Sequence, residues 1–266
     1  MPAPDNSADT ELLVAQLRKA GEIARHYYGG TYKTWHKSRG NPVTDADIEI
    51  DRFLKTSLGA ARPDYGWLSE ETADDAIRLS RARIFVVDPI DGTYGFLKHR
   101  PHFTIVAAVV ENGRPVAGAI YNPISEEMFE AVKDRGARKN GGVIQISTRS
   151  GFDGARILAE RKVMEPARWA SPWPESLTSE TRASAAYRMA LVAAGEFDAM
   201  ISLSPKSDWD VAAGDLLVHE AGGRVTTNED DLLIYNRERP VHGSVICAGP
   251  QLHARILARL HDFRPN

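Results

Sequence analysis

The chain carries between positions 84 and 93 the stretch Ile84-Phe85-Val86-Val87-Asp88-Pro89-Ile90-Asp91-Gly92-Thr93. The four apolar residues at its start predict a short buried strand. Two carboxylates follow at the end of this strand, where a proline and a glycine bend the chain so that Asp88, Asp91 and the carbonyl of Ile90 can face one point. These are hard oxygen ligands, which bind Mg²⁺ in preference to softer metal ions.

The residues after Asp91 predict a place for a phosphate. Gly92 and Thr93 begin an expected helix N-terminus, where free backbone N–H groups favour an anion. We therefore expect this stretch to bind a divalent cation and a phosphate side by side. The alternative interpretation is an ordinary turn in which one aspartate caps a helix.

Two further acidic segments are candidates for the same site. Glu70 and Glu71 follow a short apolar segment, although such a pair is also typical of a solvated acidic loop. Asp208 and Asp210 flank a tryptophan at the start of a helical pattern far downstream. Either carboxylate is placed to cap that helix or to point into a cleft.

These segments together resemble the signatures of the inositol monophosphatase superfamily of Mg²⁺-dependent, lithium-sensitive phosphatases. Residues 85–93 resemble its Trp-x-x-Asp-Pro-Ile-Asp-Gly-Thr signature, with Phe85 in place of the tryptophan. Residues 209–223 resemble its second signature, and a Val-Thr-x-x-Asp element at residues 43–47 falls in the expected order. The resemblance covers nearly the whole chain and implies an α+β or α/β fold, a layered αβαβα sandwich.

The resemblance also implies a metal-binding role for the matching residues. The first Mg²⁺ is expected on Glu70, Asp88 and the carbonyl of Ile90. The second is expected on Asp88, Asp91 and Asp210. Glu70 also reaches toward a third, weaker ion, so two or three Mg²⁺ ions are expected in all.

The resemblance further implies that catalysis depends on Asp47 and Thr93, with Glu70 assisting. Thr93 alone is a poor base, so its hydroxyl needs an acceptor such as Asp47, and a metal must first lower the pKa of the attacking water. The sequence shows no Ser-His-Asp set and no cysteine nucleophile with a supporting motif. We therefore expect direct attack by water, without a phosphoenzyme.

The composition is that of an ordinary globular enzyme. The net charge of the 266 residues is −3, so neither a nucleic acid polymer nor a membrane is expected as a partner. The single cysteine, Cys247, lies in an apolar run and is expected to be a small buried hydrophobe, which fits a reducing cytoplasm. The N-terminus lacks the pattern of a signal peptide. A homodimer is possible.

The resemblance implies two lobes, about residues 1–150 and 151–266, with the metal cleft between them. Residues through Asp9 are interpreted as a loose tail, and residues 164–177 as a loop or broken helix. Helices and strands are expected in turn through the rest of the chain. The expected helices are 11–28, 45–60 (with Ile48, Phe53, Leu54 and Leu58 facing inward), 183–195, one from Trp209, and 251–260. The expected strands are an antiparallel meander at 103–110, 116–121 and 127–132, then 156–159, 199–203 and 245–248.

Substrate choice is less strongly determined by the sequence. Inositol-specific members have a glutamate seven positions before the second-signature aspartate, and Leu203 stands there in this chain. The segment around Lys206 is similar to that of bacterial 3′(2′),5′-bisphosphate nucleotidases, so 3′-phosphoadenosine 5′-phosphate is the favoured substrate. Inositol 1-phosphate or a range of sugar phosphates is the alternative, and a non-catalytic phosphate-binding protein is a remote one. The expected substrate contacts are Gly92, Thr93, Arg182, Ser184, Lys206 and Asp210.

Two of these contacts have simpler alternatives. Ser184 is equally placed to cap the helix that follows it, and Arg182 to be a surface charge. Lys37, near the tip of an expected loop or hairpin at residues 29–41, is either close to the metal and phosphate or a solvated surface lysine.

Overall fold

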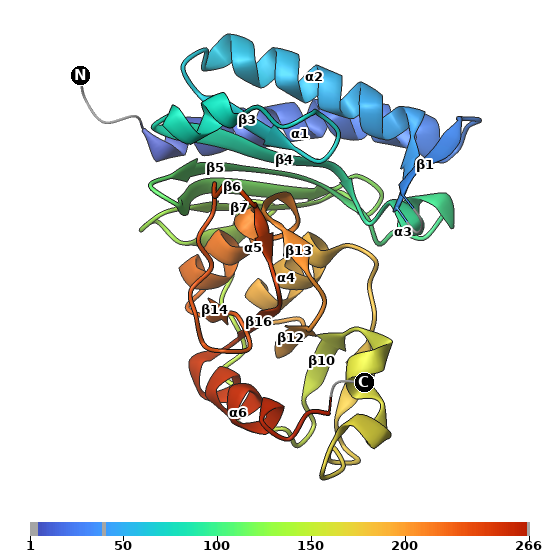
Figure 1. Ribbon diagram of the computed structural model, residues 1–266, viewed down its shortest axis with the longest axis vertical. Coiled ribbons are helices and arrows are strands. Elements are labelled where there is room, and N and C mark those ends of the chain that lie inside the picture. Colours follow the sequence, from blue (N-terminus) through green and yellow to red (C-terminus); the bar gives the residue numbers. More distant parts are fainter. Residues whose placement is uncertain (1–4, 39–40, 265–266) are drawn as a thin grey trace.

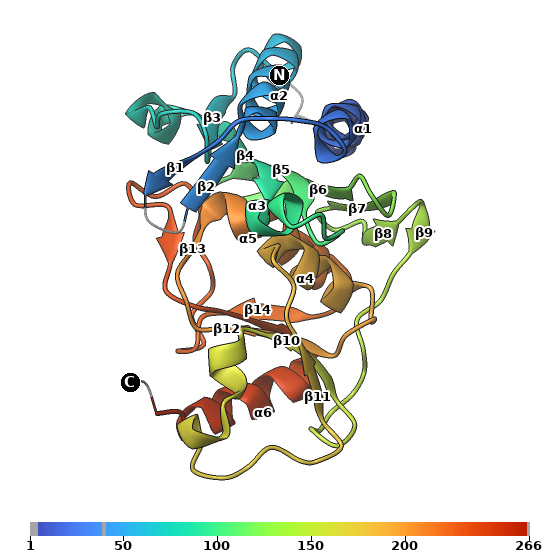
Figure 2. The same ribbon diagram turned by 90° about the vertical axis from the view of Figure 1, so that its right-hand side faces the viewer.

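Two β-sheets alternate with three layers of helices (Figures 1 and 2). The computed structural model describes residues 5–38 and 41–264. The first sheet has seven strands, in the spatial order β3 (Gly66–Ser69), β4 (Arg83–Asp91), β5 (Thr104–Glu111), β6 (Arg114–Asn122), β7 (Glu127–Val132), β8 (Ala137–Lys139) and β9 (Gly142–Val143). The second sheet has five, in the order β11 (Thr178–Glu180), β10 (Arg156–Ala159), β12 (Ala199–Ser202), β16 (Val245–Ala248) and β14 (Arg224–Thr226).

The helices fall into three layers around these sheets. The outer layer covers the first sheet and consists of α1 (Asn6–Tyr28) and α2 (Asp45–Ala61). The middle layer lies between the sheets and consists of α4 (Ala185–Ala193) and α5 (Asp208–Glu220). On the far side of the second sheet lies α6 (Pro250–Leu260). The predicted αβαβα sandwich is confirmed.

The continuous apolar run of β4 follows from its position in the middle of this stack. Successive side chains of a strand point to opposite faces. Ile84 and Val86 pack among the residues of α4 and α5, whereas Phe85 and Val87 pack among those of α1 and α2. Both faces of the strand are therefore buried, which is why no polar residue alternates with the apolar ones before Asp88.

The shorter elements connect these layers. A hairpin of β1 (Thr34–Ser38) and β2 (Asn41–Thr44) precedes α2, and α3 (Thr93–Leu97) follows β4. The pair β13 (Lys206–Ser207) and β15 (Val241–His242) lies beside α5. The 3₁₀ helices are η1 (Ala76–Ser80), η2 (Arg161–Met164) and η3 (Pro166–Arg168).

Most of the predicted elements are confirmed within a few residues. The strands β5 to β7 form the predicted antiparallel meander, and β10, β16 and α6 lie where they were expected. Residues 164–177 contain only the end of η2 and η3, which agrees with a broken segment. In α2, Leu54 and Leu58 are buried as expected, but Ile48 and Phe53 are only half-buried, and Ile50 is fully buried.

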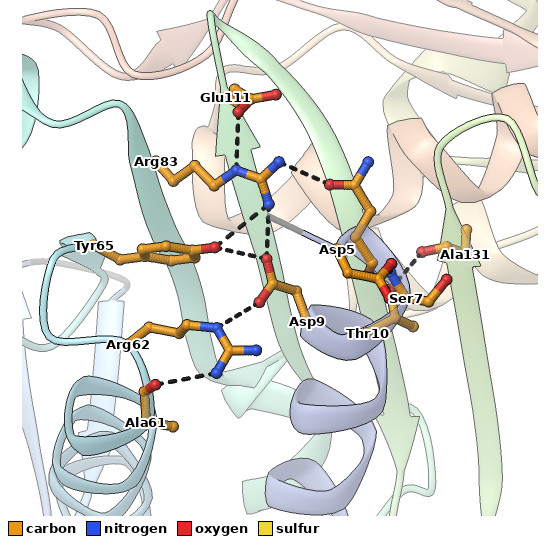
Figure 3. A network of polar contacts seen from close by, with 11 residues as sticks. Asp5, Ser7, Asp9, Thr10, Ala61, Arg62, Tyr65, Arg83, Glu111 and Ala131 are labelled. Carbon is orange, nitrogen blue, oxygen red and sulfur yellow. Dashed lines mark hydrogen bonds and ion pairs between the residues drawn. The ribbon is translucent and has the colours of Figure 1, made fainter. Parts of the chain in front are cut away.

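The expectation of a loose tail through Asp9 is wrong for the described residues. Helix α1 begins at Asn6 with Asp5 as its N-cap, and residues 1–4 lie outside the described range. Asp9 is 1% exposed, and its carboxylate accepts hydrogen bonds at 2.8 Å from Arg62, Tyr65 and Arg83 (Figure 3). This network fixes the start of α1 against α2 and the first sheet, a long-range contact that the local sequence does not encode.

The boundary between the two predicted lobes stays a prediction. The middle helices α4 and α5 come from the second lobe, yet their side chains share one apolar core with β4, β5 and β6. Within the described residues no helix is both long and apolar enough to cross a membrane. Cys247 is fully buried in β16, where burial raises the pKa of its thiol to about 12, as expected for a packing residue.

Candidate metal centre and catalytic site

The turn after β4 requires the glycine at position 92. Gly92 has a φ of +91°, which places it in the left-handed region. A Cβ atom there would lie 2.8 Å from the backbone nitrogen of Ser184 and 3.0 Å from the carbonyl oxygen of His102. The chain therefore leaves the sheet sharply at Asp91 and enters α3 at Thr93, with Asp88 and Asp91 at the strand end.

Three aspartates converge at this strand end. Asp88, Asp91 and Asp210 each present a carboxylate oxygen, and these atoms lie within 4.8 Å of one another. Two come from the end of β4, and the third comes from the first turn of α5, where it also accepts a hydrogen bond from the Ser207 backbone at 2.7 Å. Asp210 thus both caps its helix and joins the cluster, whereas its neighbour Asp208 is buried against His242.

The charges of the cluster oppose one another. Burial, and then the charges of Glu70, Asp91 and Asp210, raise the pKa of Asp88 well above its usual value. Burial also raises the pKa of Asp91, and burial and Asp91 raise that of Asp210 to about 8. Buried carboxylates in mutual contact are stabilised as anions by a divalent cation with oxygen preference. The donor set fits Mg²⁺.

Glu70 and Glu71 lie at the end of β3 beside this cluster. Glu70 is not one of the three residues within 4.8 Å, but its charge contributes to the raised pKa of Asp88 and Asp210. Lys37 of the β1–β2 hairpin reaches both glutamates, with Nζ 2.6 Å from Glu71 and 3.6 Å from Glu70. Lys37 thus lies beside the predicted ligand Glu70 and is at the same time partly exposed to solvent, so a role for it at a metal or phosphate stays a prediction.

Asp47 and Thr93 meet across the site. The Thr93 hydroxyl lies 3.4 Å from one carboxylate oxygen of Asp47 and 3.1 Å from the carbonyl of Ile90. The other Asp47 oxygen accepts hydrogen bonds from the backbone and side chain of Thr44, at 2.8 Å and 2.5 Å, in a capping box. This cap explains the Val-Thr-x-x-Asp element, because it orients Asp47 at the start of α2. Burial raises the pKa of Asp47 to about 6.

Ser184 lies behind Asp91. The Asp91 carboxylate accepts hydrogen bonds from the Ser184 hydroxyl at 2.6 Å and from the backbone N–H groups of Ala185 and Ala186 at 3.2 Å and 2.6 Å. Ser184 is fully buried and is the N-cap of α4, which confirms the alternative interpretation of this residue. The N-terminus of α4 therefore orients Asp91, and a contact of Ser184 with substrate stays a prediction.

A cavity of about 410 Å³ opens beside the cluster. Its lining combines two of the aspartates with charged side chains from β10, α4 and β13 and their flanking loops: Asp91, Glu160, Thr181, Arg182, Ala183, Ala185, Arg188, Pro205, Lys206 and Asp210. The predicted contacts Arg182 and Lys206 are thus on the cavity wall. Each already has a counter-ion, Glu180 at 2.5 Å for Arg182 and Glu160 at 3.2 Å for Lys206.

Sequence reasoning missed two charged residues of this cavity, Glu160 and Arg188. Glu160 follows β10, and it accepts hydrogen bonds from the Leu203 backbone and from the hydroxyls of Ser202 and Ser204. A carboxylate therefore lies next to Leu203, although no carboxylate occupies position 203 itself. A signal for Arg188 was present, since it is the only charged residue in the apolar helix Ala185–Ala193.

Comparison with known proteins identifies the class to which this fold and site belong. The model of the inositol monophosphatase family matches residues 5–264. An inositol-1-monophosphatase of Caulobacter vibrioides is 33% identical over 93% of this chain and 99% of its own length. The Nus factor SuhB of Escherichia coli K12 is 29% identical over 94% of this chain and 95% of its own length.

Solved structures agree with this result. The extragenic suppressor protein SuhB of Bartonella henselae superposes with a TM-score of 0.85 at 29% identity, over 95% of this chain and 98% of that chain. An IMPase of Thermotoga maritima gives a TM-score of 0.82 at 26% identity, over 94% and 96%. The protein is a phosphatase. It belongs to the inositol monophosphatase family.

Proposed function

We propose that this protein is a Mg²⁺-dependent phosphomonoesterase that hydrolyses a small phosphate ester by direct attack of water. The observation that carries this proposal is the convergence of Asp88, Asp91 and Asp210 beside the contact between Asp47 and Thr93. Asp88, Asp91 and Asp210 would hold Mg²⁺ with the carbonyl of Ile90, and Glu70 would complete the set. When bound, Mg²⁺ supplies charge neutralisation for the phosphate and lowers the pKa of water.

The chain's own residues supply the proton path. The Thr93 hydroxyl donates to Asp47 and so turns its oxygen lone pairs toward the attacking water. As water loses its proton to Thr93, Thr93 passes its own proton to Asp47. The pKa of Asp47, about 6, is well placed for this role, because a general base is most effective with a pKa near the working pH.

For the substrate we propose 3′-phosphoadenosine 5′-phosphate. The cavity beside the metal cluster is lined by Arg182, Arg188 and Lys206, which suit an ester with a second negative group. A second cavity of about 400 Å³ adjoins it, with Thr181 lining both, and offers room for a group larger than the reacting phosphate.

A second candidate substrate is inositol 1-phosphate. It is favoured by the name of the Caulobacter relative and by the carboxylate of Glu160, which is an acceptor suited to sugar hydroxyls. Four donors already bind this carboxylate: the hydroxyls of Ser202 and Ser204, the Leu203 backbone and Lys206. Its capacity for substrate hydroxyls is therefore reduced.

Measurement of phosphate release with Mg²⁺ tests both the proposed metal mechanism and the proposed substrate. The two substrates are compared at equal low concentration, with EDTA as the control. We expect the nucleotide to be hydrolysed at least tenfold faster than inositol 1-phosphate. The reverse preference would support the second candidate and retain the metal mechanism, whereas equal rates with EDTA and Mg²⁺ would reject the mechanism itself.

A further inference from the structure

Arg188 is a buried arginine on the wall of the substrate cavity. It lies in the middle of α4, a helix whose nine residues are all buried, and it is 3% exposed. Its Nε donates a long hydrogen bond of 3.4 Å to the carbonyl of Ser184. Among the described residues, its buried Nη1 has no hydrogen-bond partner. An unused donor on a buried charged group is costly, so its retention calls for a function.

The neighbouring charges leave this guanidinium without a direct partner. Glu160 and Asp91 are the anions that act on Arg188 most strongly, and burial lowers its pKa more than they raise it. Glu160 is already bound by Lys206 and two serine hydroxyls, and Asp91 by the N-terminus of α4. Arg188 therefore differs from Arg182 and Lys206, whose charges each have a counter-ion within 3.2 Å.

We propose that Arg188, with Lys206 of the same cavity lining, is the specificity-determining site for a second phosphate group of the substrate. This inference rests on the proposed phosphomonoesterase function and concerns the end of the substrate that does not react. A guanidinium presents two parallel N–H donors to phosphate oxygens, and such charge-assisted bonds are among the strongest in proteins. A second phosphate gives Nη1 the acceptor that the protein does not provide.

The lining of the cavity allows one molecule to contact both the aspartate cluster and Arg188. Asp91 and Asp210 line the same cavity of about 410 Å³ as Arg188 and Lys206. A phosphate ester held at the aspartates by Mg²⁺ can therefore extend its other end toward Arg188 within the same cavity. A small molecule with two phosphates on one sugar is of the right class, and a substrate with only the reacting phosphate leaves Arg188 unused.

The test compares two substrates that differ only in the second phosphate, namely 3′-phosphoadenosine 5′-phosphate and adenosine 3′-monophosphate. The wild-type protein should show a kcat/KM at least tenfold higher for the bisphosphate. In Arg188→Met this ratio should fall to near one, mainly through a higher KM for the bisphosphate. Arg188→Lys keeps the charge but not the paired donors and should retain an intermediate ratio, which keeps the test valid if the methionine variant does not fold.

Arg156→Met is the matched control, because Arg156 is an exposed arginine of β10 that does not line the cavity, and it should leave the ratio unchanged. Equal loss of both activities in Arg188→Met and Arg188→Lys would overturn the inference and make Arg188 a structural counter-charge for Asp91 and Glu160. A wild-type ratio near one would also overturn it, while Mg²⁺-dependent turnover of either substrate would leave the proposed function intact. Turnover of neither nucleotide nor inositol 1-phosphate would overturn both.

Discussion

The molecule buries aspartates in two regions with opposite electrostatics. Asp9 in α1 lies between Arg62, Arg83 and Tyr65, so the fold itself supplies its positive partners (Figure 3). Asp88, Asp91 and Asp210 lie against one another at the end of β4, where burial raises the pKa of each and neighbouring carboxylates raise those of Asp88 and Asp210 further. The same side chain is thus buried in one place with its counter-charge and in the other without it.

This difference separates stability from function. The buried carboxylate of Asp9 stabilises the packing of α1, because its loss would deprive the buried Arg83 of part of its counter-charge. A cluster of buried carboxylates destabilises the fold until a cation binds. The presence of such a cluster in a folded protein therefore indicates a cation-binding site. Substitutions in the two regions should therefore affect different properties of the protein.

The largest expected effect on activity is that of Asp91→Asn. This change removes one anionic ligand at the centre of the cluster, and the amide oxygen can still accept a hydrogen bond from the N-terminus of α4. We expect Mg²⁺-dependent phosphate release to be abolished while the circular dichroism spectrum is unchanged. Retained activity would contradict the assignment of Asp91 as a metal ligand.

Thr93→Val should have the next largest effect, since it removes the hydroxyl between water and Asp47 but keeps a similar shape. General-base assistance contributes about 10²–10⁴-fold to rates, so kcat should fall by that order with little change in KM. Steady-state kinetics measure the change, and Thr93→Ser serves as the control that keeps the hydroxyl. A kcat unaffected by the valine would exclude Thr93 from the proton path.

Asp9→Asn should lower the stability of the fold while leaving the catalytic activity nearly unchanged. The change leaves Arg83 buried without its full counter-charge, and removal of one partner of a buried pair costs about 3–5 kcal/mol. The free energy of unfolding from urea titrations should fall by about that amount, while kcat at a permissive temperature stays near the wild-type value. A loss of activity without loss of stability would show that the two regions are coupled.

The pH dependence of stability should also distinguish the cluster. The pKa of Asp210 is about 8 in the folded protein, against a usual value of 3.8. Between these values the folded state binds more protons than the unfolded state, so the free energy of unfolding falls as pH rises. In EDTA, Tm should therefore fall between pH 5 and pH 8, and Mg²⁺ should raise it more at pH 8. If Tm rises over this range in both the wild type and Asp210→Asn, the raised pKa of Asp210 in the folded protein is contradicted.

The smallest expected effect is that of Lys37→Gln on stability. Lys37 pairs with Glu71 at 2.6 Å, and its own side chain is 30% exposed. The Glu71 carboxyl is buried, and burial raises its pKa to about 7, so it can take up a proton when the lysine is removed. Partly exposed ion pairs contribute about 0–1 kcal/mol, so the free energy of unfolding should change by no more than this. Thermal unfolding measures it. A larger loss would mean that the β1–β2 hairpin is held mainly by this one contact.

The sequence was sufficient for the parts of the site that lie on local motifs. The stretch from Asp88 to Thr93 predicts its own turn, and the helix expected at residues 45–60 places Asp47 in its first turn. The contacts that join distant segments were not predictable in this way. Glu160 meets Leu203 only because β10 and β12 are neighbours in the second sheet, and Asp9 meets Arg83 only when α1 packs on the first sheet.

Titration calorimetry of Mg²⁺ into the wild-type protein and Asp91→Asn tests the central claim most directly. The claim is that the aspartates at the end of β4 are kept buried together in order to bind divalent cations. The wild type should bind at least two ions, and the variant should lose at least one of them while Asp9→Asn retains them all. Equal stoichiometry and affinity in wild type and Asp91→Asn would contradict this account.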